Sequence, residues 1–141
     1  MTDDFDLQRF VDAQDGGGTY DQALAELHAG QKRSHWMWFV FPQVAGLGRS
    51  TTARHYAISG LDEARAYVVH PVLGPRLLES ARALTALDTS DAVAVFGGTD
   101  AQKLRSSMTL FAAAAPDEPV FGQVLDQYFG GALDEGTTAR L

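Results

Sequence analysis

The chain has 141 residues, of which 45% are hydrophobic and 21% charged, a composition typical of one globular domain over residues 1–141. Its net charge of −7 argues against general binding to nucleic acid or to anionic lipid, because both rely on lysine and arginine. No cysteine is present, which excludes disulfides, thiolate catalysis and cysteine-ligated zinc.

Apolar residues recur at helical spacing along most of the chain, between clear start and stop signals. Gly30 stands where a glycine ends a helix, Ser50 is suited to cap the next one, and Pro71 places a boundary near His70. The segments predicted to be helical are 6–14, 19–30, 50–58, 61–70, 77–87, 99–115 and 120–129. Residues 90–96 fit a helix or a strand equally well.

The run WMWFVF at 36–41 is the hardest part of the chain to assign. It is apolar at every position, so its periodicity cannot distinguish a helix from a strand, and its aromatic and β-branched residues also suit a strand. Ser34 as an N-cap and Pro42 as a terminator favour a buried helix of two turns.

The whole pattern predicts an all-α fold, a single multihelical domain built as an irregular bundle of about seven to nine short helices. Residues 1–5 and 135–141 are expected to fray. The acidic N-terminus lacks the apolar stretch of a signal peptide, and the longest apolar runs are about six residues, far too short to span a bilayer. A cytoplasmic protein without membrane contact is expected.

Several long motifs resemble a bacterial family of unknown function, number 1810, whose members are often mislabelled calpastatin. The motifs are YDQALAELHAGQKRSHWMWFVFPQVAGLGRS, HYAI, HPVLGPRL, FGGTDAQKLRSSMTLF and VLDQYFGG, and the resemblance runs from about residue 8 to residue 141. It implies a mainly helical single domain and no established activity. Calpastatin inhibitory segments are disordered, so that label does not fit this chain.

Standard catalytic and metal-binding motifs are missing from the sequence. The four histidines lie 7, 20 and 15 residues apart, so no pair has the spacing of metal ligands on one helix face. There is no Walker A loop and no GxSxG elbow, and we expect no metal site and no cofactor.

Polar residues at the edges of two apolar segments are the best candidates for a site. The first segment is SHWMWFVFPQ at 34–43, preceded by two cations, and the second is KLRSSMTLF at 103–111. We expect the segments to face each other. An aromatic floor with convergent polar groups is typical of small-molecule pockets. The candidate ligand-binding residues are Lys32, Arg33, Ser34, Trp36, Trp38, Gln43, Arg105, Ser106 and Ser107.

His35 is the one group in the first segment that could act as a general acid or base near neutral pH. The sequence allows three outcomes. The segments form a buried polar network, or they line a site for a small anionic metabolite such as a nucleotide or phosphorylated ligand. Alternatively, the protein is a non-catalytic interaction module with a purely structural aromatic core.

Overall fold

The computed structural model describes residues 3–141, and the all-α prediction is confirmed: within that range the chain forms helices and no strand. In chain order they are α1 (Gln8–Asp15), the 3-10 turn η1 (Gly16–Gly18), α2 (Thr19–Ala29), α3 (Met37–Val40), α4 (Thr51–His55), α5 (Leu61–Val69), α6 (Leu73–Thr85), α7 (Ala92–Phe96), α8 (Gly98–Ala114), α9 (Val120–Phe129) and α10 (Glu135–Thr138). Within residues 3–141, no helix combines the length and the apolar character that crossing a membrane requires.

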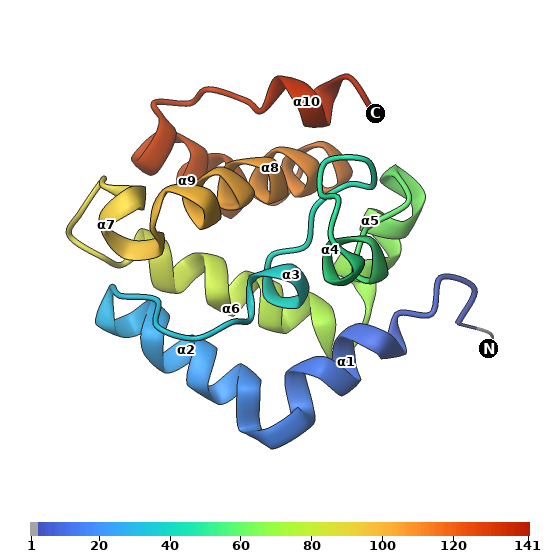
Figure 1. Ribbon diagram of the computed structural model, residues 1–141. Coiled ribbons are helices and arrows are strands. Elements are labelled where there is room, and N and C mark those ends of the chain that lie inside the picture. Colours follow the sequence, from blue (N-terminus) through green and yellow to red (C-terminus); the bar gives the residue numbers. More distant parts are fainter. Residues whose placement is uncertain (1–2) are drawn as a thin grey trace.

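Helix α8 is the centre of the fold, and α5, α7, α9 and α10 all pack against it (Figure 1). Its sequence explains this position, because its buried residues include the unbroken run from Ser106 to Phe111 and therefore cover every face of the helix. Helix α6 joins the two sides of the core, since it packs against α2, α5 and α9.

Most predicted helix ends are confirmed. Gly30 adopts a left-handed φ of 73° after α2, and the Ser50 hydroxyl accepts a hydrogen bond of 3.1 Å from the amide of Ala53 at the start of α4. Helix α5 ends at Val69, directly before His70. The ambiguous segment 90–96 contains a short helix, α7, which Asp91 caps.

The predicted two-turn helix after Ser34 is wrong. Only Met37–Val40 is helical, Trp36 holds the N-cap position, and Ser34 caps nothing. The exposed and covered residues alternate from Gln31 to Trp36, as they do in an extended chain. The cause is a distant carboxylate on α2, described below.

The chain after α3 is tied to the segment after α4 by one isolated parallel bridge between Val44 and Ile58. The amide of Ala45 donates to Ile58 (2.7 Å), and the amide of Ile58 donates to Gln43 (2.8 Å). This bridge places Gln43 beside the end of α4.

Both segments expected to fray make hydrogen bonds within residues 3–141, and their fraying stays a prediction. The Asp3 carboxylate accepts hydrogen bonds from the amides of Leu7 (2.7 Å) and Gln8 (2.8 Å) before α1. At the other end, Asp134 caps α10. The part of this prediction that concerns residues 1 and 2 lies outside the described residues.

Candidate functional site

The carboxylate of Glu26, in the last turn of α2, organises the segment before α3. Its side chain is buried and accepts five hydrogen bonds. The donors are the backbone amides of Arg33 (2.7 Å) and Ser34 (2.9 Å), the Ser34 hydroxyl, the indole Nε1 of Trp36 (3.0 Å) and the side-chain amide of Gln22 (2.9 Å). Because two successive backbone amides bind one carboxylate, the chain is extended here instead of helical.

Glu26 is held in its ionised form. Burial raises the pKa of the carboxylate, but the hydrogen bonds lower it by more, and the Ser34 hydroxyl contributes most to the lowering. The net result is a pKa well below the ordinary value of a glutamate. With every donor directed at it, this carboxylate stabilises the fold and is not exposed to a ligand.

Two lysines share one aspartate next to this network. The Lys32 ammonium lies 2.8 Å from one oxygen of Asp100, and the Lys103 ammonium lies 3.6 Å from the other. Lys32 also donates to the carbonyl of Ser34 (2.5 Å), and its side chain is only 7% exposed. Lys103 is 22% exposed and has the longer contact, so it is the less firmly paired of the two cations.

Lys103 covers the indole of Trp38. Its Nζ lies 4.8 Å from the ring centroid, a distance at which an ammonium is attracted to the face of tryptophan. Trp38 is partly buried, whereas Trp36 is fully buried. The predicted contact between the two apolar segments therefore exists, and it is made by Trp38 and Lys103.

A small recess lies between these segments and α4. Its volume is about 10 Å³, which is room for about one water molecule. The residues that line it are Met37, Trp38, Phe41, Gln43, Val44, Gly48, Ala53, Tyr56, Ala57 and Lys103. Gly48 is needed there because a Cβ at this position would lie 2.5 Å from the Cβ of Ala53.

Two polar side chains at the recess have no partner within residues 3–141. Neither the amide of Gln43 nor the hydroxyl of Tyr56 makes a hydrogen bond to another described residue, although both are partly buried. The Tyr56 ring is fixed from two sides, with its centroid 5.7 Å from that of Phe10 and 5.3 Å from that of Phe39. The residues that line the recess thus include a glutamine, a tyrosine and a lysine beside a tryptophan.

Two other candidate residues of the first segment lie at the surface. His35 is exposed, and so is Arg33, whose guanidinium donates to the side chain of Gln31 (3.0 Å). Neither lines the recess. The general acid or base suggested by the sequence is therefore not placed at this site.

The candidate residues of the second segment point elsewhere too. Arg105 donates to the carbonyls of Ala132 (3.0 Å) and Leu133 (2.7 Å), so it fastens the C-terminal segment to α8. The buried Ser106 hydroxyl donates to the backbone carbonyl one turn earlier (3.1 Å). Ser107 is fully buried and its hydroxyl has no hydrogen-bond partner within residues 3–141.

Sequence reasoning missed Glu26, Tyr56, Asp100 and Lys103 as site residues. Glu26 carried a usable signal, because it occupies the apolar face of α2 between Ala23 and Leu27, where a charged residue needs a partner. Tyr56 carried no such signal, since only the folded chain brings it to the recess.

A family model described as "Protein of unknown function (DUF1810)" matches residues 4–141. The chain belongs to this family. Membership in DUF1810 confirms the resemblance seen in the sequence and brings no activity with it. Among curated proteins no match was found.

A solved structure similar to this chain is the crystal structure of the conserved hypothetical protein Rv1873 from Mycobacterium tuberculosis. The two chains are 48% identical, and the match covers 99% of this chain and 98% of that one, with a TM-score of 0.95. The DUF1810 fold described above is therefore shared with that protein, whose name states no function.

Proposed function

We propose that the recess between Trp38 and Lys103 is a binding site for a small anionic metabolite, such as a phosphorylated compound or a nucleotide. The observation that supports this most directly is the convergence of four groups from separate parts of the chain: Trp38, Gln43, Tyr56 and Lys103. Among the described residues their polar atoms have no hydrogen-bond partner or only a weak ion pair, and they are reachable from solvent, so they are available to a ligand.

Charge favours an anion at this site. Two ammoniums contact a single carboxylate, so the pairs around Asp100 leave one positive charge without a counter-ion. Lys32 is held by Asp100 and Ser34 and is only 7% exposed, so Lys103 is the cation that can turn toward a ligand. Gln43 and Tyr56 would then donate to the oxygens of the anion.

The size of the recess limits how a ligand would bind. A volume of about 10 Å³ admits only a water-sized group while Lys103 lies over the indole. Movement of that flexible side chain would uncover the Trp38 face, on which a planar ring can stack. We propose no catalytic step, because His35 lies outside the recess.

The other two parts of the proposal follow from charge and ligand class. Binding to nucleic acid is not part of it, because the net charge is −7. Anionic metabolites of this class are abundant in the cytoplasm, and we propose that the protein acts there.

The alternative, an interaction module, has weaker support. It predicts a contiguous exposed apolar patch. The large apolar residues that are most exposed are Val69, Val93, Leu133 and Leu141, which lie on α5, on α7 and on either side of α10. Single exposed apolar residues are ordinary on protein surfaces.

A thermal-shift titration with inorganic phosphate and AMP tests the proposal. Ligand at about 100 times its Kd should add about 2.7 kcal/mol to the stability of the wild-type protein. Lys103→Gln should remove the shift. Arg65→Gln is the matched control, because it deletes one positive charge from an exposed pair on α5 and should leave the shift unchanged. An equal shift in Lys103→Gln and wild type, or no shift with either compound, would contradict the proposal.

A further inference from the structure

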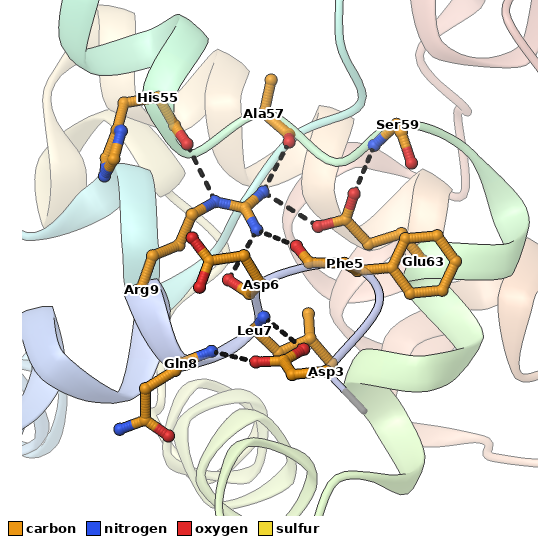
Figure 2. Close-up of polar contacts among 10 residues, drawn as sticks. All are labelled: Asp3, Phe5, Asp6, Leu7, Gln8, Arg9, His55, Ala57, Ser59 and Glu63. Atoms are coloured by element: carbon orange, nitrogen blue, oxygen red, sulfur yellow. Dashed lines mark hydrogen bonds and ion pairs between the residues drawn. The ribbon is translucent and has the colours of Figure 1, made fainter. Parts of the chain in front are cut away.

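Arg9, in the first turn of α1, uses every donor that a guanidinium has. Its Nε donates to the carbonyl of His55 (2.9 Å), one terminal nitrogen donates to Phe5 (2.6 Å) and Asp6 (2.9 Å), and the other donates to Ala57 (2.9 Å) and to the Glu63 carboxylate (2.9 Å). An arginine has five N–H donors, so none is left over. Figure 2 shows the guanidinium at the centre of these acceptors.

The acceptors come from three separate parts of the chain. Phe5 and Asp6 belong to the N-terminal segment, where Asp6 adopts a left-handed φ of 53°. Glu63 lies on α5, and its second oxygen accepts from the amide of Ser59 (2.9 Å). The Arg9 side chain is 12% exposed and that of Glu63 is 4% exposed, so water screens this ion pair little.

Two of the acceptors flank Tyr56. His55 and Ala57 are its neighbours in the chain, and both Tyr56 and Ala57 line the recess. Because Arg9 holds a carbonyl on each side of Tyr56, it fixes the backbone from which the tyrosine side chain extends. We propose that Arg9 is a positioning residue for the recess, through which the N-terminal segment controls the wall that carries Tyr56.

This inference rests on the proposed function, but it has a test that needs no ligand. The chain has four tyrosines, so 3-fluorotyrosine labelling gives a simple fluorine NMR spectrum in which Tyr56→Phe identifies the Tyr56 signal. Arg9→Lys keeps the positive charge and has three donors in place of five. It should shift or broaden the Tyr56 resonance in the folded protein.

Arg76→Lys is the matched control. Arg76 also pairs with a carboxylate, that of Asp15 (2.8 Å), and its guanidinium lies 4.9 Å from the centroid of the Tyr20 ring. It does not line the recess. This variant should change the Tyr20 resonance and leave the Tyr56 resonance as in wild type. The two arginines thus report on two different tyrosines.

Binding adds the second readout. Below the melting temperature of the variant, Arg9→Lys should raise the Kd for AMP about tenfold, and Arg76→Lys should not change it. If Arg9→Lys lowers the melting temperature while the Tyr56 resonance and the Kd stay as in wild type, Arg9 is only structural and the inference is overturned. If wild type binds neither phosphate nor AMP, the proposed function fails and the Tyr56 resonance alone decides the role of Arg9. Should Arg9→Lys not fold, Glu63→Gln, which removes the charge of one acceptor, takes its place in both measurements.

Discussion

Replacement of Glu26 by glutamine is expected to destabilise the protein substantially while preserving the shape of the side chain. One carboxylate oxygen accepts three hydrogen bonds, from the amides of Arg33 and Ser34 and from the indole of Trp36, and the other accepts two. A glutamine can keep the three bonds on its carbonyl, but they lose the charge of the acceptor.

The size of the effect follows from these bonds. Hydrogen bonds to charged groups contribute about 1.5–3 kcal/mol each and neutral ones about 0.5–1.5, so three weakened bonds cost about 3 kcal/mol. The lower desolvation cost of a neutral amide offsets part of this loss. A net loss of about 2 kcal/mol should lower the melting temperature of a domain of this size by roughly 8 °C.

Thermal unfolding followed by circular dichroism between pH 7 and pH 3 provides the measurement. The pKa of Glu26 in the folded protein lies below that of an unfolded glutamate, which is about 4.3. Its contribution is therefore complete above that pH and declines as the pH falls toward the folded pKa. The difference between wild type and Glu26→Gln should accordingly narrow at pH 3.

Asp62→Asn is the control, because its exposed pair with Arg65, at 3.6 Å, should contribute at most about 1 kcal/mol. A melting temperature of Glu26→Gln within the range of this control would refute the role given to Glu26. So would a difference from wild type that stays constant between pH 7 and pH 3.

Four further variants test the packing and one helix cap. Trp36→Ala should lower the free energy of unfolding by roughly 3–5 kcal/mol, because the Trp36 side chain is fully buried. Trp38→Ala should lower it by about 2 kcal/mol, because Trp38 is only partly buried. Chemical denaturation of both variants would show whether this order holds. Gly74→Ala should destabilise the protein by roughly 1–3 kcal/mol or prevent folding, since a Cβ there would lie 2.1 Å from the carbonyl oxygen of Val68; a normal melting curve would show that the close approach of α5 and α6 is not required. Asp134→Ala removes the cap of α10 and should increase hydrogen exchange over residues 132–141, while unchanged protection would contradict the role of this cap.

Local signals were sufficient for most of the helices. Ser50, Gly30 and the prolines act on their immediate neighbours, so the sequence alone places the helix ends that they determine. The failure at residues 34–41 has a different cause. Ser34 has the chemistry of an N-cap, but its amide and hydroxyl bind Glu26, eight residues earlier, and this competing interaction decides the conformation.

The candidate site was predictable in kind and not in detail. The contact between the two apolar segments and the proposed roles of Trp38 and Gln43 follow from the composition of the segments. The contribution of Tyr56 could not be predicted in this way, because it depends on the bridge between Val44 and Ile58, and no local sequence pattern predicts that bridge. Arg105 also looks like a binding residue in the sequence, and only the fold shows that two carbonyls of the C-terminal segment occupy it.

The buried polar network and the proposed ligand site are parts of one connected unit and not competing explanations of the same residues. Glu26 holds Ser34, the carbonyl of Ser34 accepts from Lys32, and Lys32 takes the shorter contact with Asp100. Lys103 is left with the longer contact and is therefore the cation that we propose binds the anion.

This connection separates the two kinds of variant. Lys103→Gln removes a partly exposed charge, so it should reduce AMP binding with a change in stability of about 1 kcal/mol or less. Glu26→Gln should reduce both the stability and the AMP binding, because a loosened Ser34 no longer holds Lys32 against Asp100. If Glu26→Gln lost stability but bound AMP like wild type at a temperature where it is folded, the network would be independent of the site. Lys103 would then be able to bind an anion only because it is partly exposed, and not because of the Glu26 network.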